Sequence, residues 1–520
     1  MLFNSYIFIL LFLPITLFGF YMIGGRGHHR IAISWLVAAS LVFYGYWNPA
    51  YLGLILGSMI FNYAVGIALS SRDVSRPGML LFLGIFANLA LLGYFKYANF
   101  FVDSVNHLFK ESWHLETIIL PLAISFFTFQ QIAFLVDARR QETRELNFLH
   151  YALFVTFFPQ LIAGPIVHHK EMLPQFAKNE IYRFCHSSFA IGVSIFAIGL
   201  FKKVVIADGI AEYSSPVFAA AERPGETLSF LEAWGGALGY TFQIYFDFSG
   251  YSDMAIGLAR MFGVQLPVNF FSPYKARSII EFWRRWHMTL SRFLRDYLYI
   301  PLGGSRCGPI RRYANLMITM LLGGLWHGAG WTFVVWGGLH GFYLMVNHAW
   351  HRVEARLGEM PFTVRFLGRQ VGYFLTFLAF VVAWVVFRAE SMDGANSILS
   401  AMAGSNGIVL PSWWVYHLPF LEYFVETSSR DGELFGQFGD VSGYTFIVFL
   451  FLWVWLLPNT SQLFFDQRNT QYGVPVLVHK RKYKWWQWQP HITWAVITAL
   501  LLFFSGLHMS RVSEFLYFQF

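Results

Sequence analysis

The sequence predicts an all-α polytopic membrane protein. Of its 520 residues, 56% are hydrophobic and only 13% are charged, which is about half the charged fraction of soluble domains. Apolar runs recur from residue 4 to residue 508, and spans of about 20 residues suit a hydrocarbon core about 30 Å thick. The loops between the first runs also alternate in Arg content. A soluble fold would need a polar surface that this composition does not supply.

Five apolar runs form the first part of the chain, and their loops set its orientation. Three loops carry two or three Arg residues each, whereas the loops at 48–50 and 96–116 carry none. Cytoplasmic loops collect Lys and Arg, so Met1 is predicted to lie outside. The first run lacks the basic start and cleavage site of a signal peptide and is predicted to be retained as a span. The predicted spans are 4–23, 31–47, 51–70, 78–95 and 117–137, and the Arg-bearing loops are 24–30, 71–77 and 138–146.

The last third of the chain gives an independent indication of orientation. Segment 351–369 carries four Arg residues and is predicted to be cytoplasmic. Span 371–387 then leads out to an acidic loop, span 443–458 returns to a basic and Trp-rich stretch, and span 491–508 places the C-terminus outside. The acidic loop holds Glu422, Glu426, Asp431, Glu433 and Asp440, and the basic stretch holds Lys480, Arg481, Lys482, Lys484, Trp485, Trp486 and Trp488.

The middle of the chain is less regular. Residues 148–166 end in a segment broken by Pro159, Gly164 and Pro165, which predicts a re-entrant element lining protein or a wet cavity. With partial helices included, we expect 11 to 13 spans. No internal repeat is apparent, which disfavours the inverted-repeat transporters. We expect a core over 1–390 and a C-terminal extension over 391–520 with the acidic outer loop and two further spans.

Charge and cysteine content exclude several function classes. The net charge of +8 is explained by basic cytoplasmic loops, so membrane lipids and no nucleic acid are the expected contacts. Only Cys185 and Cys307 are present, without a CxxC pattern, so neither a disulfide framework nor a Cys-based metal site is indicated. No P-loop, GxSxG, HExxH or Rossmann pattern occurs. The His pairs at 28–29 and 168–169 lack partners at ligand spacing, and no metal is expected.

Three segments between residues 240 and 350 depart from a lipid-facing composition. The first is 245–254, where Asp247, Ser249 and Asp253 lie inside an apolar stretch. Ionisable groups at membrane depth are costly and usually functional. The alternative is that they hydrogen-bond broken helices together. We therefore assign these three residues a supporting role in a site.

The second segment runs from Glu281 to Leu298. Four polar residues there recur at steps of three, four and four, which predicts one stripe of an amphipathic helix at the cytoplasmic interface. Residues 275–312 hold nine Lys and Arg against two acids, a patch that suits the phosphates of coenzyme A or anionic lipid headgroups. The lipid alternative does not explain the histidine in the stripe. The stripe is Arg284, His287, Ser291 and Arg295, the opposing apolar stripe is Phe282, Trp286, Phe293 and Tyr297, and the donor-contact candidates are Arg284, Arg285, Ser291 and Arg295.

The third segment, 313–350, contains no Asp, Glu, Lys or Arg. Basic flanks at both ends predict a membrane hairpin. His327, in Trp326-His327-Gly328, would lie about 21 Å along a helix that begins at 313. A neutral imidazole can act as a base near pH 7, so His327 is predicted to be catalytic, with Trp326 in support. His340 is interpreted as structural.

These segments resemble the membrane-bound O-acyltransferase (MBOAT) family, and within it the bacterial alginate O-acetyltransferase (AlgI) type. The resemblance implies a helical funnel across the membrane, with an essential histidine at its narrow point. That role falls on His327, and a second functional position falls on His287, the histidine that closes FWRRWH. The matching stretches are 94–100, 159–165, 245–257, 282–304 and 321–329.

The resemblance further implies a polysaccharide O-acetyltransferase in the bacterial cytoplasmic (inner) membrane. Acetyl-CoA would be its donor substrate, with no bound cofactor, and a periplasmic or surface partner protein would complete acetyl delivery. The acceptor could be alginate, cellulose, peptidoglycan or another exopolysaccharide. His287 would orient the donor or stabilise the oxyanion. Three other functions stay open: a polysaccharide-precursor transporter or flippase, D-alanyl transfer to teichoic acid, and a scaffold that only recruits partners.

Overall fold

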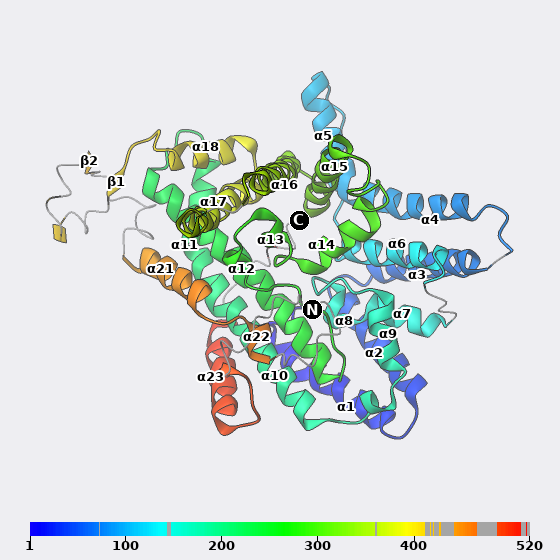
Figure 1. The fold of residues 1–520 in the computed structure, drawn as a ribbon. Coiled ribbons are helices and arrows are strands. Elements are labelled where there is room, and N and C mark those ends of the chain that lie inside the picture. The colour runs from blue at the N-terminus through cyan, green and yellow to red at the C-terminus, as the bar shows by residue number, and fades with distance from the viewer. Residues whose placement is uncertain are drawn as a thin grey trace. The chain divides into compact units, whose positions relative to one another are not determined.

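A computed structural model describes the chain except residues 72, 143–146, 359–360, 411–415, 418–419, 421–425, 428–440, 465–485, 511–515 and 517–520. Between its loops, the described chain forms helices and two short strands, β1 (Val409–Leu410) and β2 (Glu426–Thr427), which pair in parallel (Figure 1). The predicted all-α class is therefore confirmed. The chain divides into two compact units, each built from several chain segments. The first contains Met1–Phe201, Tyr251–Asn269 and Thr460–Val512, and the second contains Lys202–Gly250, Phe270–Asn459 and Ser513–Phe520.

The first unit begins with helices that match four of the five predicted N-terminal spans closely. The predicted span 117–137 instead begins later, at Ile124, because Pro121 lacks an N–H and disfavours helix in the residue before it. Residues 148–166 are broken as predicted, with α7 and α8 separated at Phe157. The elements are η1 (Phe8–Phe12), α1 (Leu13–Gly24), α2 (His29–Gly45), α3 (Tyr51–Ser70), α4 (Pro77–Leu92), η2 (Gly93–Tyr97), α5 (Ala98–Phe109), α6 (Ile124–Arg139), α7 (Phe148–Thr156), α8 (Phe158–Leu161), α9 (His169–Phe176), η3 (Asn179–Tyr182), α10 (His186–Phe201), α22 (Thr460–Phe464) and α23 (Ile492–His508).

Buried amide side chains join three apolar helices of the first unit. Asn62 of α3 and Asn88 of α4 exchange hydrogen bonds of 3.1 and 2.6 Å. Asn62 also donates to Gln131 of α6, and Ser58 donates to the same Gln131 oxygen at 2.9 Å. Polar side chains at membrane depth are stabilised by bonding one another across helices. This cluster therefore fixes how α3, α4 and α6 pack.

The second unit contains the three segments singled out by the sequence, apart from the end of the first. Helix α12 is 32 residues long, about 48 Å, and contributes its residues up to Gly250 to this unit. The elements are η4 (Lys202–Ala207), α11 (Asp208–Ala221), α12 (Phe230–Met261), η5 (Pro273–Lys275), α13 (Ile279–Trp283), α14 (Met288–Leu294), η6 (Arg295–Tyr299), α15 (Pro309–His327), α16 (Trp331–Leu357), α17 (Phe362–Arg388), α18 (Met392–Met402) and α21 (Val441–Leu456).

The predicted hairpin over 313–350 is present as α15 and α16, which lie against each other (Figure 1). Only glycine fits where they cross. A Cβ on Gly324 would meet the backbone of Gly337, and a Cβ on Gly337 would meet the Leu321 backbone at 3.1 Å. Small residues let membrane helices approach closely, which gains packing contacts along both backbones. The crossing places His327 at the turn between the two helices.

Within the described residues, four helices are long and apolar enough to cross a membrane, and four shorter helices are also apolar. One of the long ones, His186–Ala221, was absent from the predicted spans because Lys202 and Lys203 interrupt its apolar sequence. The total of 11 to 13 spans, the orientation and the division at residue 390 stay predictions. Arg72, Arg144, the acidic-loop side chains and residues 480–485 lie outside the described residues. The four long helices are Tyr51–Ser70, Pro77–Phe109, His186–Ala221 and Phe362–Arg388, and the shorter ones are Phe8–Gly24, His29–Gly45, Ser442–Leu456 and Ile492–His508.

Candidate active site

His327 is the last residue of α15, and its side chain is buried among aromatic rings. Its ring centroid lies 5.0 Å from that of Trp326, 5.1 Å from Trp336 and 5.4 Å from Phe387. These rings come from both helices of the hairpin and from the end of α17. Apolar walls of this kind exclude water, which strengthens electrostatic interactions within the site and suppresses hydrolysis of a reactive acyl group.

His287 is fully buried and lies at a break in the backbone. Its φ is +40°, a left-handed conformation that costs non-glycine residues free energy and recurs at functional sites. The predicted continuous helix over Glu281–Leu298 is therefore wrong: α13 ends at Trp283, and α14 begins only at Met288. The break separates Arg284 from the other stripe residues and turns the His287 ring inward, edge-on to Phe248 with centroids 4.7 Å apart.

The structure brings the two predicted histidines together. The ring centroids of His287 and His327 are 6.4 Å apart and their planes are inclined by 58°. Trp326, predicted as a supporting residue, lies beside both, at 6.3 Å from His287. One small carbonyl or hydroxyl group can therefore contact both imidazoles at once. One imidazole can accept a proton while the other donates a hydrogen bond, which is the pair of roles that acyl transfer needs.

Asp247 is buried one residue before Phe248 and belongs to an ion cluster. Its carboxylate lies 2.6 Å from the Lys203 ammonium, which also lies 2.7 Å from the Asp208 carboxylate. Lys203 and Asp247 side chains are each 2% exposed. Buried charges in proteins are normally paired in this way. Asp247 therefore joins α12 to the π-helical turn η4, and its supporting role in the site stays a prediction.

The other two supporting residues lie elsewhere on α12. Ser249 is buried, and its hydroxyl has no hydrogen-bond partner within the described part of the chain. Asp253 is also buried but belongs to the first unit, where it accepts a hydrogen bond of 2.6 Å from Thr460. This hydrogen bond joins α12 to α22, which is the structural alternative to a role in the site.

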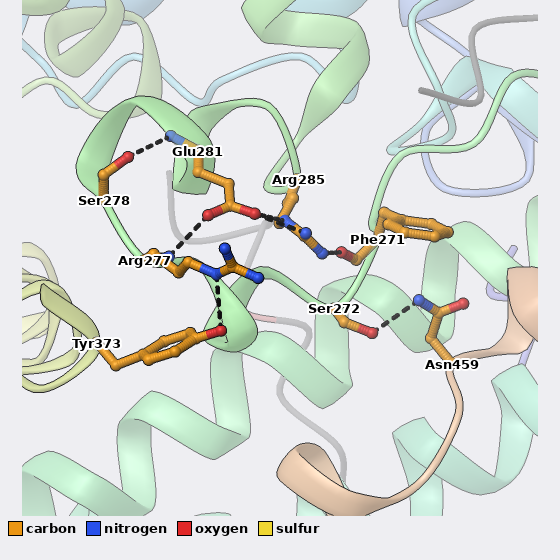
Figure 2. Close-up of polar contacts among 8 residues, drawn as sticks. All are labelled: Phe271, Ser272, Arg277, Ser278, Glu281, Arg285, Tyr373 and Asn459. Carbon is orange, nitrogen blue, oxygen red and sulfur yellow. Dashed lines mark hydrogen bonds and ion pairs between the residues drawn. The ribbon is translucent and has the colours of Figure 1, made fainter. Parts of the chain in front are cut away.

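The donor-contact candidate Arg285 is held within a network of hydrogen bonds (Figure 2). It pairs with Glu281 at 2.7 Å and donates to the Phe271 carbonyl at 3.2 Å. Glu281 also accepts from the Arg277 backbone at 2.9 Å, and Ser278 caps the same helix by accepting from the Glu281 N–H. Ser and Glu three residues apart are a helix-start signature. The network fixes the loop before α13 and thereby the break that holds His287.

The remaining donor-contact candidates differ in exposure and pairing. Arg284 is exposed at the break between α13 and α14. Ser291 is half-buried and donates to the Trp286 carbonyl at 3.4 Å. Arg295 is exposed and pairs with the neighbouring Asp296 at 2.7 Å. Among the described residues, no group of three His, Cys, Asp or Glu side chains could hold a metal ion.

Comparison with protein families identifies the family of this chain. A family model described as MBOAT, membrane-bound O-acyltransferase family, matches residues 80–383, more than half of the chain. The chain belongs to the membrane-bound O-acyltransferase family. It is therefore a membrane protein and an acyltransferase, as the sequence predicts, and both buried histidines lie within the matched region.

Three relatives of this MBOAT chain are similar to it in sequence over half of its length or more. A peptidoglycan O-acetyltransferase of Helicobacter pylori is 46% identical over 438 residues, 79% of this chain and 81% of the relative. A probable alginate O-acetylase, AlgI, of Pseudomonas aeruginosa is 42% identical over 409 residues, 77% of this chain and 75% of the relative. A teichoic acid D-alanyltransferase of Streptococcus thermophilus is 26% identical over 290 residues, 52% of this chain and 69% of the relative.

Two charged residues beside Asp247 were not predicted from the sequence. Lys203 and Asp208 complete the cluster around Asp247 but lie about 40 residues before it. The sequence does contain one signal for them, since Lys202-Lys203 interrupts an otherwise apolar run. Charges at membrane depth usually have a buried partner. Sequence spacing does not name that partner, since it comes from another helix.

Two substitutions of His287 should distinguish the effect of its backbone conformation on stability from the effect of its imidazole on activity. We expect His287→Gly and His287→Ala to lose acyl transfer equally, because both remove the imidazole. Glycine in a regular element usually costs about 0.5–1 kcal/mol relative to alanine. At a φ of +40° the order should reverse, with the Gly variant at least as stable as the Ala variant. Thermal unfolding of the detergent-solubilised protein measures this, and a clearly more stable Ala variant would contradict the strained conformation.

Proposed function

We propose that this acyltransferase moves an acetyl group from cytoplasmic acetyl-CoA to hydroxyls of an extracytoplasmic polysaccharide. The relatives named as acetylating peptidoglycan and alginate are 46% and 42% identical over more than three quarters of this chain. The relative named for D-alanyl transfer is more distant, at 26% identity over about half of the chain. The relatives therefore favour an acetyl group and a polysaccharide acceptor.

The buried histidine pair is the observation that carries this proposal. His287 and His327 lie 6.4 Å apart between ring centroids, within walls of aromatic side chains. A transporter would need a polar route for its substrate, whereas acyl transfer needs a base and a hydrogen-bond donor close together, roles that two neighbouring imidazoles can fill. Holding reactants in such a geometry lowers the entropic part of the barrier.

The reaction follows from the two imidazoles. The acceptor hydroxyl gives its proton to His327 while its oxygen attacks the thioester carbonyl carbon. A tetrahedral intermediate forms, and His287 donates a hydrogen bond to its oxyanion. The carbon–sulfur bond then breaks, the acetyl ester leaves on the acceptor, and His327 returns the proton to the coenzyme A thiolate. Protons and electron pairs balance without a further reactant.

His327 is suited to the base role by its place at the end of a helix. The carbonyl groups in the last turn of α15 carry partial negative charge, which favours the imidazolium formed when His327 accepts the proton. An alternative course, in which His327 itself carries the acetyl group before transfer, uses the same residues. Both courses require the His327 ring to contact the reacting carbonyl or the acceptor hydroxyl.

The proposal also includes the membrane location of the chain, its orientation and a partner protein. The chain would lie in the bacterial cytoplasmic membrane with Met1 and its C-terminus outside, so that the donor enters from the Arg-rich side. A periplasmic or surface partner protein would carry the acetyl group onward or present the polymer. A through-membrane site is useful because acetyl-CoA is too polar to cross the bilayer, and only the acetyl group needs to pass.

The purified protein in liposomes provides the test. Labelled acetyl-CoA is supplied on one face and alginate or peptidoglycan oligosaccharides on the other, and thiol release and acceptor labelling are both measured. We expect thiol release that depends on the acceptor. D-alanyl transfer instead predicts activity only with a carrier-bound D-alanyl thioester, and a transporter predicts oligosaccharide movement without thioester cleavage. A scaffold predicts that cells with a His327→Ala chain acetylate their polymer normally.

A further inference from the structure

At the end of the α15–α16 hairpin opposite His327, an arginine contacts a histidine instead of a carboxylate. Arg312 lies in the first turn of α15, and its guanidinium Nη2 is 2.9 Å from His348 Nδ1 on α16. A guanidinium only donates hydrogen bonds, so the histidine nitrogen must accept. Arg312 is therefore held in place by a neutral ring rather than by a carboxylate. This contact orients its charge without neutralising it.

A second arginine lies at the same end of the hairpin. Arg352 follows His348 by one turn of α16, and its guanidinium lies over the Tyr313 ring of α15 at 5.2 Å. We call Arg312 and Arg352 the hairpin arginines.

The hairpin arginines differ from two donor-contact candidates in having no acidic partner. Arg285 and Arg295 form ion pairs with Glu281 and Asp296, but within the described ranges neither of the hairpin arginines contacts a carboxylate. One Arg312 nitrogen, Nε, is also buried without a hydrogen-bond partner among the described residues. Guanidinium groups bind phosphate through paired N–H donors. An anion with several oxygens would therefore complement these donors.

The length of α15 restricts what that anion can belong to. Arg312 and His327 are 15 residues apart on one continuous helix, a separation of about 22 Å. A ligand that uses both ends must carry phosphate at one end and a reactive acyl group at the other, joined by a long arm. A short acyl phosphate cannot reach both.

We propose that the hairpin arginines bind the terminal phosphates of a long thioester donor whose acyl group reaches His327. This inference rests on the proposed function for its acyl end and on the unpaired arginines for its phosphate end. The phosphate of an anionic lipid headgroup has the same chemistry and is the alternative source. The site selects donors by length: acetyl-CoA is used, whereas acetyl phosphate is not.

Binding of adenosine 3′,5′-bisphosphate, the phosphate-bearing end of coenzyme A, tests the site without turnover. We expect calorimetry in zwitterionic detergent to show binding to the wild type that weakens at least tenfold in Arg312→Gln. Arg312→Lys, which keeps the charge but loses the paired donors, should be intermediate. Arg365→Gln removes an exposed arginine of α17 that lies outside the cluster, and it should bind like the wild type. Equal binding in Arg312→Gln and wild type would overturn the proposal.

Kinetics and lipid titration distinguish the two phosphate sources. In liposomes, the ratio of kcat/KM for acetyl-CoA to that for acetyl-pantetheine, which lacks phosphates, should fall at least tenfold in Arg312→Gln. If Arg312→Gln instead abolishes only stabilisation by phosphatidylglycerol, the site binds lipid and the donor assignment is wrong. A chain that binds the bisphosphate through Arg312 but cleaves no acetyl-CoA would contradict the proposed function and leave the phosphate site intact.

Discussion

His327→Gln should lower kcat for acetyl transfer by about 10²–10⁴-fold, the usual contribution of a positioned general base. Glutamine fills much of the same volume and keeps hydrogen-bonding atoms, but it cannot accept a proton near neutral pH. The donor should still bind, because the proposed phosphate contacts lie at the far end of α15. We therefore expect KM for acetyl-CoA to stay within a few-fold of the wild-type value, measured with purified protein in liposomes.

His340 offers a matched control for this substitution. It is fully buried on the same hairpin, and Trp336 lies between it and His327, with ring centroids 4.7 Å and 5.1 Å away, respectively. His340→Gln should disturb the packing around Trp336 and lower the melting temperature, while kcat falls far less than in His327→Gln. If both variants lose activity equally, aromatic packing rather than proton transfer explains the loss, and His327 is not the base.

The sequence predicts the hairpin and the place of His327 at its turn, because the signals for both are local. Residues 313–350 lack charge, and Gly328 and Gly330 mark a turn immediately after His327. Their position within the segment is enough to place His327 between two helices. The three-ring environment of His327 is only partly foreseeable, because Phe387 comes from α17. Resemblance to the MBOAT family adds the functional role, which spacing alone does not assign.

Periodicity fails at His287 because it does not detect a single left-handed residue. The stripe from Arg284 to Arg295 fits a helical repeat, yet the helix ends at Trp283. What stabilises the break is the contact of Arg285 with the Phe271 carbonyl and of Arg277 with the Tyr373 hydroxyl at 2.9 Å. These partners lie 14 and 96 residues away in sequence. A helical pattern in one window contains no information about them.

The second large effect that we expect is loss of stability in Lys203→Met. The ammonium of Lys203 lies between the carboxylates of Asp247 and Asp208, at 2.6 and 2.7 Å. Methionine has a similar length and suits an apolar interior, but it removes the positive charge that both carboxylates contact. Removing one partner of a buried ion pair typically costs about 3–5 kcal/mol. Thermal unfolding in detergent, followed by tryptophan fluorescence, should show a large drop in melting temperature.

Restoring the charge balance separates the structural role of Asp247 from a role in the reaction. In Lys203→Met with Asp247→Asn, the fully buried carboxylate becomes neutral, and the remaining Asp208 side chain is 13% exposed and can retain water contacts. The double variant should therefore be more stable than Lys203→Met alone; equal instability would mean that the ion cluster does not control the packing of η4 and α12. If the stabilised variant regains acetyl transfer, Asp247 acts only by holding α12 and the neighbouring Phe248 against His287. If it folds but stays inactive, the charge of Asp247 or Lys203 contributes to the reaction itself.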